Sequence, residues 1–182
     1  AAWGQSGRGG NYALGYTGEG GPLGPLPSVS SAAARPELVD QALECVRHQV
    51  ERCHGAHLGT VVSHSLGGGT GSGLGTRLIE EVRDAFPESF LLDVTILPVS
   101  LGENPVQAYN ALLALAALQE LTDGVVLYEN DRLVAAAERR VSAGKEAGER
   151  IFGAATDSGV SLAAMNNIIA RDLTPFVCPP GA

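Results

Sequence analysis

Two kinds of apolar pattern alternate along the chain. Continuous apolar runs rich in β-branched residues predict buried strands at residues 58–65, 90–97 and 125–128. Apolar positions at helical spacing predict helices at residues 36–54, 74–86, 106–121 and from about 157 onward. Buried strands that alternate with amphipathic helices are typical of the α/β class, so we expect a three-layer fold with a parallel sheet.

A glycine-rich run separates the first predicted strand from the helix that follows it. Its residues are Gly67, Gly68, Gly69, Thr70, Gly71, Ser72 and Gly73, and Ser65 lies just before them. Glycine leaves backbone N–H groups unshielded, and the first N–H groups of a helix carry the positive end of its dipole. The run therefore predicts a phosphate-binding loop, to which Thr70 and Ser72 can add hydroxyl donors. A plain glycine-rich turn is the alternative.

Two familiar glycine signatures do not fit this run. It has no Lys for G-x-x-x-x-G-K-[ST], and G-x-G-x-x-G cannot be laid on it. A dinucleotide-binding oxidoreductase is therefore disfavoured, whereas a stand-alone α/β nucleoside triphosphatase remains an alternative.

A second glycine-rich loop lies near the start of the sequence. It contains Gly7, Arg8, Gly9, Gly10 and Asn11, which can present backbone amides and a guanidinium group to an anion. A frayed terminus is the alternative interpretation of the same composition.

Polar residues also lie at the ends of the later strands. Glu103 can accept hydrogen bonds from ribose hydroxyls or serve as a helix N-terminal charge. We expect Asn104 to cap that helix and Pro105 to occupy its first helical position. Asn130 can cap the next helix or match the edge of a guanine with its amide.

The four histidines are interpreted as surface or capping groups.

The glycine-rich runs resemble those of the tubulins. The ten residues from His64 to Gly73 look like the tubulin signature, and Ser72 favours tubulin over its bacterial relative FtsZ. The first loop is similar to the tubulin loop Gly-Gln-Ser-Gly-Ala-Gly-Asn-Asn-Trp-Ala, which faces the nucleotide phosphates. It departs from that loop at Arg8, Gly10 and Tyr12, and Gly10 removes a polar contact.

The same resemblance implies further ligand contacts. It implies that Glu103 faces the nucleotide and that Asn130 and Asn166 contact a guanine base. Gln107 stands where tubulins have a second acid. Leu162 stands where many tubulins stack an aromatic ring on the base, so we expect weaker base stacking.

The function implied by the resemblance is that of a GTP-binding cytoskeletal protein, whose partners are GTP or GDP, other tubulin subunits and microtubule ends. Mg²⁺ is implied as well, with ligands outside this sequence. Residues 127–131 and 71–75 look most like delta-tubulin, which implies a role in the triplet microtubules of centrioles and basal bodies. A conventional microtubule subunit is the alternative. No catalytic residue is assigned, and we expect any GTP hydrolysis to depend on assembly.

Composition sets further limits. A net charge of −8 and a pI near 4.9 argue against a nucleic-acid surface, and no apolar run approaches the roughly 18 residues of a membrane span. Three cysteines are too few for a disulfide framework, which favours a reducing compartment such as the cytoplasm. Zinc binding by Cys45, His48, Cys53, His54 and His57 is disfavoured, because Cys45 to His54 follow one continuous helical pattern that scatters the side chains around its axis.

The extent of the resemblance leads us to expect a fragment. Residues 1–182 would form part of one GTP-binding domain, with tubulin segments expected before and after it. Residues 18–34 are rich in Gly, Pro, Ser and Ala, so we expect a flexible surface insertion there.

Overall fold

The computed structural model describes residues 9–17, 38–53, 57–99, 104–142 and 161–177. The chain divides into two compact units, Ala1–Leu127 and Tyr128–Ala182. The insertion expected at residues 18–34 lies outside the described residues.

The first unit is built on a sheet with the strand order β1-β2-β3. The strands are β1 (Gly59–Ser65), β2 (Phe90–Leu97) and β3 (Gly124–Glu129), close to the predicted ranges. β1 and β2 run parallel, with Gly59 opposite Phe90 and Ser65 opposite Ile96. A helical crossover joins each strand to the next, as parallel pairing requires. The predicted α/β class with a parallel sheet is confirmed.

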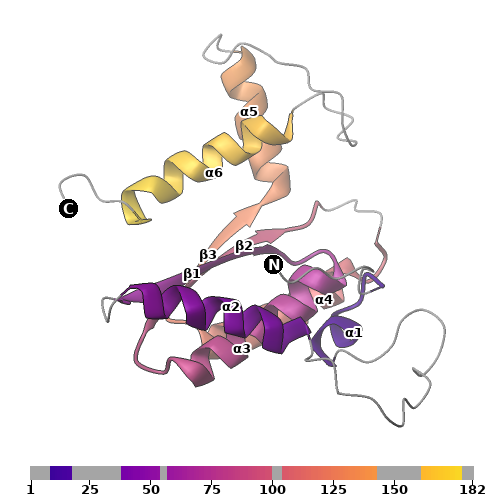
Figure 1. Ribbon diagram of the computed structural model, residues 1–182. Coiled ribbons are helices and arrows are strands. Elements are labelled where there is room, and N and C mark those ends of the chain that lie inside the picture. The colour runs from indigo at the N-terminus through magenta and orange to yellow at the C-terminus, as the bar shows by residue number, and fades with distance from the viewer. Residues whose placement is uncertain (1–8, 18–37, 54–56, 100–103, 143–160, 178–182) are drawn as a thin grey trace. The chain divides into compact units, whose positions relative to one another are not determined.

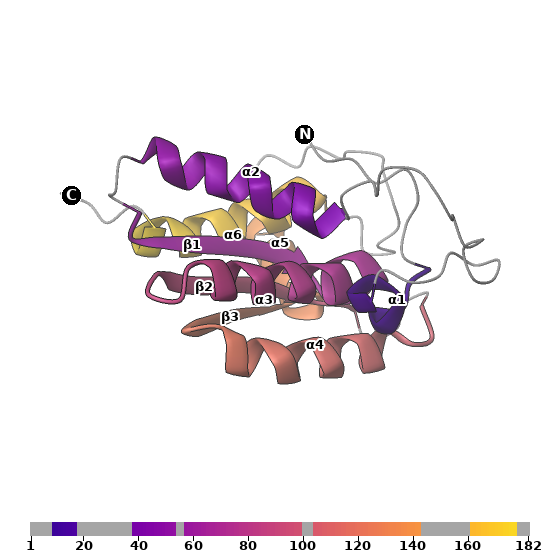
Figure 2. The same cartoon turned by 60° about the horizontal axis from the view of Figure 1, so that its bottom comes forward.

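Three helices lie side by side on one face of this sheet (Figures 1 and 2). They are α2 (Leu38–Arg52), α3 (Gly75–Ala85) and α4 (Gln107–Leu121). Their apolar stripes meet the inward side of the strands in one core, whose buried members are Leu43, Leu66, Ile79, Val82, Leu91, Ala111, Ala114 and Leu118. Full burial of each large aliphatic side chain stabilises the fold by about 1.5–3 kcal/mol. This core fixes where β1 and β2 end and where the next helices begin.

The second unit contains α5 (Asn130–Ser142) and α6 (Leu162–Val177). The two helices pack through Leu133, Ala137, Met165 and Ile168, all of which are buried. Leu162, the residue expected in place of a stacking aromatic ring, is 54% exposed at the first position of α6.

Among the described residues, no helix combines the length and apolar character needed to cross a membrane.

Candidate functional site

The glycine-rich run forms a tight junction between β1 and α3. Leu66 is fully buried, and its amide donates to the Ile96 carbonyl at 3.0 Å, which anchors the run to β2. The chain then enters one turn of π-helix, η1 (Thr70–Leu74), which continues into α3 without leaving helical backbone angles. The prediction that this helix begins at Leu74 is therefore wrong, because it begins four residues earlier, within the glycines.

The open edge of this junction consists of backbone amides. The Ser72 amide donates to the Gly68 carbonyl at 3.1 Å, so the amides of residues 68–71 precede this hydrogen-bonded turn. Gly68 and Thr70 are exposed, and a Cβ added at Gly68 would have no atom within 4 Å. The backbone is therefore open to an anion at Gly68 and Thr70, as a phosphate-binding loop requires, whereas Gly69 between them is buried.

Other residues of the run pack inside the protein. The Ser72 hydroxyl is buried and donates to the Gly68 carbonyl at 2.6 Å, so the expectation that it faces a ligand does not fit this geometry. A Cβ on Gly71 would lie 2.0 Å from the Ser65 carbonyl oxygen, and one on Gly73 would lie 2.2 Å from the Tyr12 carbonyl oxygen. These two glycines allow close backbone packing, which is a different role from exposing amides.

The short helix α1 (Tyr12–Thr17) packs directly against η1. Gly15 makes this approach feasible, because a Cβ there would lie 1.9 Å from the Gly69 carbonyl oxygen. The Tyr16 hydroxyl donates to the Glu80 carboxylate at 2.6 Å, a bond that raises the pKa of Tyr16. α1 is therefore fixed to both η1 and α3, and the first glycine-rich loop is held close to the second.

The described part of that first loop turns sharply into α1. Gly9 and Gly10 have φ angles of +58° and +64°, in the left-handed region that glycine adopts without strain. The Asn11 side-chain oxygen accepts the Ala13 amide at 2.8 Å, so Asn11 caps α1. Two further predicted contacts, Gly7 and Arg8, lie outside the described residues.

Two asparagines near the start of α4 join the glycine loops. The Nδ2 atom of Asn104 lies 2.7 Å from the Gly10 carbonyl oxygen and 3.1 Å from that of Gly67. The Nδ2 atom of Asn110, which is 2% exposed, makes contacts of the same two lengths with the same two oxygens. Gly10 and Gly67 are 57 positions apart in the sequence. The two asparagine side chains therefore connect the two loops through hydrogen bonds.

The helix-capping prediction for Asn104 and Pro105 is wrong in detail. α4 begins at Gln107, and its N-cap Val106 makes no side-chain capping bond. Asn104 instead accepts the Val106 amide through its side-chain oxygen at 3.2 Å, while its amide nitrogen faces the glycine carbonyls. Sequence reasoning assigned no role to Asn110. The available signal was a pair of asparagines flanking the start of a helix after a strand.

His64 also supports the glycine run from within the protein. Its side chain is 8% exposed, with Nε2 3.0 Å from Asp93 Oδ1 and Nδ1 2.7 Å from the Gly71 carbonyl oxygen. The interpretation of this histidine as a surface or capping group is wrong. Asp93 is fully buried on the neighbouring strand, so the pair ties η1 to the sheet.

The predicted base contacts lie in the second unit. Asn130 is half-buried at the first position of α5, and Asn166 is exposed on α6. Glu103, the predicted ribose contact, lies outside the described residues. The roles of these three residues stay predictions.

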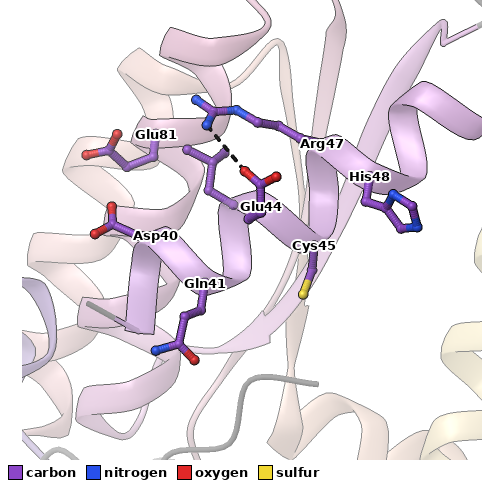
Figure 3. A pocket seen from close by; sticks show the side chains of 8 residues that line it. Asp40, Gln41, Glu44, Cys45, Arg47, His48 and Glu81 are labelled. Atoms are coloured by element: carbon purple, nitrogen blue, oxygen red, sulfur yellow. Dashed lines mark ion pairs between the residues drawn. The ribbon is translucent and has the colours of Figure 1, made fainter. Parts of the chain in front are cut away.

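A separate open pocket of about 780 Å³ lies along α2 (Figure 3). Asp40, Glu44 and Glu81 contribute three carboxylates to it, and Arg47 pairs with Glu44 at 3.7 Å. Figure 3 shows Cys45 and Gln41 pointing away from Glu81. This acidic lining suits a phosphate poorly, so the pocket does not compete with the glycine loops as an anion site.

The two cysteines within the described residues, Cys45 and Cys53, show no arrangement for a metal. Cys45 and Cys53 are free and exposed on or next to α2. Within the described ranges, no three His, Cys, Asp or Glu residues come together as a metal-binding group.

Comparison with known proteins gives a consistent family match. The description "Tubulin/FtsZ family, GTPase domain" fits residues 29–138, which include the second glycine-rich loop and Asn130. The chain is 39% identical over 132 residues to the tubulin beta-1 chain of Colletotrichum graminicola, and 40% identical over 131 residues to that of Colletotrichum gloeosporioides. It is 36% identical over 132 residues to the tubulin beta-3 chain of Zea mays.

These alignments cover 71–72% of the chain but only 26% of each relative, so the chain spans about a quarter of the length of these tubulins. The family match covers more than half of the chain and includes the strand, glycine run and helix that form the candidate site. The chain therefore belongs to the Tubulin/FtsZ family.

Proposed function

We propose that this chain binds GTP and that the phosphates are held by the two glycine loops. The observation that carries the proposal is the direct contact of both loops with the same asparagine amides, beside the exposed residues Gly68 and Thr70. Backbone amides at a helix start favour a polyanion through hydrogen bonds and through the helix dipole. Gly68 leaves open space at this edge.

The exposure of the individual residues supports a division of roles. Gly68 and Thr70, which are exposed, are proposed to provide amides to the phosphates, and the Thr70 hydroxyl is proposed to add a donor. Gly69 is buried and Gly71 is half-buried, so their amides are proposed to contribute through the helix dipole. Gly73 and Ser72 support the loop from inside. The described residues of the two loops include no Asp or Glu. They therefore supply no carboxylate ligand to a Mg²⁺ ion that is bound together with GTP. Asn130 and Asn166 are proposed to contact the base.

The biological role proposed for the whole protein is that of a nucleotide-dependent cytoskeletal subunit. Membership in the Tubulin/FtsZ family supports assembly with other tubulin subunits. The curated relatives are β-tubulin chains, which supports a conventional microtubule subunit. Residues 127–131, Leu-Tyr-Glu-Asn-Asp, support the second candidate, a delta-like protein of centrioles and basal bodies. Localisation of the tagged protein along whole microtubules or only at centrioles distinguishes the two.

Nucleotide competition tests the proposed ligand. Fluorescent GTP bound to the chain should be displaced by unlabelled GTP and only weakly by ATP, because the base-reading amides match guanine. Asn166→Ala should weaken GTP binding about tenfold, because it removes one or two hydrogen bonds to the base. ATP binding should not change.

Asn167→Ala is the matched control, since Asn167 is the exposed neighbour on the same helix. Equal weakening by both variants would contradict the base-reading role. Equal displacement by ATP and GTP would contradict the ligand itself. Hydrolysis by dilute protein at a rate per chain that is independent of concentration would favour a stand-alone nucleoside triphosphatase.

A further inference from the structure

We propose that Asn104 and Asn110 are positioning residues that lock the two glycine loops into one phosphate-binding surface. This inference rests on the proposed function and deepens it, because it assigns the geometry of the site to side chains that need not touch the nucleotide. The two asparagines reach both loops from the start of α4.

The donors and acceptors of this cluster match in number. Two side-chain NH₂ groups carry four hydrogens, and the two carbonyl oxygens of Gly10 and Gly67 carry four lone pairs. Each amide nitrogen lies 2.7 Å from the Gly10 oxygen and 3.1 Å from the Gly67 oxygen, so every hydrogen has an acceptor. Such a fully satisfied network defines one relative position of the two loops.

The orientation of each amide is fixed by its other end. Asn110 Oδ1 accepts the Tyr12 amide at 2.8 Å, and Asn104 Oδ1 accepts the Val106 amide at 3.2 Å. A backbone N–H must face an oxygen, so the NH₂ group of each side chain must face the glycine carbonyls. Asn110 thereby also connects the first turn of α1 to the same cluster.

The cluster also decides which polar groups of the loops face outward. With the Gly10 and Gly67 carbonyls turned toward the asparagines, their negative ends point away from the loop surface. Gly10 has a left-handed φ of +64°, and a Cβ there would lie 3.0 Å from Asn104 Nδ2, so a larger residue would crowd the asparagine. The following amides are left to face an anion.

The test compares Asn110→Asp and Asn104→Ala with the wild-type chain. Asn110→Asp keeps the acceptor for Tyr12 but places a carboxylate against two carbonyls, whereas Asn104→Ala removes two donors from a half-buried position. Gln119→Glu is the matched control, because it adds the same charge at an exposed position of the same helix. Binding of GTP, GDP and guanosine is measured by calorimetry, and backbone amide signals by NMR.

We expect Asn110→Asp to weaken GTP and GDP binding about tenfold or more, and Asn104→Ala to weaken it about threefold to tenfold. Guanosine binding should not change, since guanosine has no phosphates. In both variants, with or without nucleotide, the amide signals of Asn11 and Gly68 should both shift relative to the wild-type chain. Gln119→Glu should neither weaken nucleotide binding nor shift these two signals.

Several results would overturn the inference. One is normal GTP binding with unshifted loop signals in Asn104→Ala, and another is an equal loss of guanosine binding, which indicates a merely structural effect. If Asn110→Asp does not fold, Asn104→Ala decides. If the wild type binds no GTP, the proposed function fails, while the coupled NMR shifts still test the positioning role separately.

Discussion

Gly71→Ala is the sharpest test of how the glycine run is built. The added Cβ would lie 2.0 Å from the Ser65 carbonyl oxygen, 3.0 Å from the Ser65 carbonyl carbon and 3.2 Å from the Ser65 nitrogen. All three are backbone atoms at the end of β1, whose register with β2 fixes them. Relief to an ordinary separation of at least 3.4 Å must therefore move η1 away from the strand.

Three contributions determine how much Gly71→Ala changes the free energy of unfolding. Overpacking of this kind costs about 1–3 kcal/mol. Movement of η1 also breaks the 2.7 Å bond between His64 Nδ1 and the Gly71 carbonyl oxygen, worth about 1 kcal/mol. Alanine in a helix offsets about 1 kcal/mol of this. The net loss is about 1–3 kcal/mol, which for a chain of this length lowers Tm by about 3–10 °C.

Gly68→Ala is the control for this prediction. It lies three residues earlier in the same run, where a Cβ meets no atom within 4 Å, so the free energy of unfolding should change by no more than about 0.5 kcal/mol. Thermal unfolding followed by circular dichroism measures both variants. An unchanged Tm for Gly71→Ala, or an equal loss in both variants, would refute the packing role of Gly71.

Three further predictions concern the first unit. Single replacement of His64 or Asp93 by Leu should lower the free energy of unfolding by about 3–5 kcal/mol, because the remaining residue stays buried without its partner at 3.0 Å. In urea unfolding, the double replacement should cost less than the sum of the two single replacements, and strict additivity would contradict an interaction between the two residues. The Arg83 guanidinium and then the Leu91 amide hold the pKa of Asp123 below its usual range, so the carboxylate adds stability above its unfolded-state pKa that is lost as pH falls through the folded-state pKa. Asp123→Asn should therefore lower Tm at neutral pH but not in strong acid, and a pH-independent difference would contradict this reasoning. Ile79→Ala, in the core, should cost about 2–5 kcal/mol, whereas Leu112→Ala, at a position 65% exposed on α4, should cost less than about 1 kcal/mol; comparable losses would contradict the assigned core.

The strands and helices were predictable because their signals are local. β2 occupies residues 90–97 as predicted, since a continuous apolar run matches a strand buried in a parallel sheet. α2 ends at Arg52, shortly before Gly55, which follows the usual preference for glycine beyond a helix end. Local composition also located the glycine run between a strand and a helix.

The arrangement of the site was less predictable, because it depends on contacts between distant segments. The bonds from Asn110 to Gly10 and Gly67 span 100 and 43 positions, so the neighbouring residues of Asn110 do not identify these two partners. His64 was misassigned for the same reason, since its burial depends on Asp93 in the next strand. Composition alone likewise could not separate Gly68, which is open, from Gly71 and Gly73, which permit close packing.

The central claim is that backbone amides at the head of η1 bind the phosphates of GTP, and an NMR titration of the isotope-labelled chain tests it most directly. Addition of GTP should shift the amide signals of residues 68–71 most strongly, whereas guanosine, which lacks phosphates, should leave these signals in place. GTP-induced shifts confined to other segments, or equal shifts of these four amides with guanosine, would contradict the account.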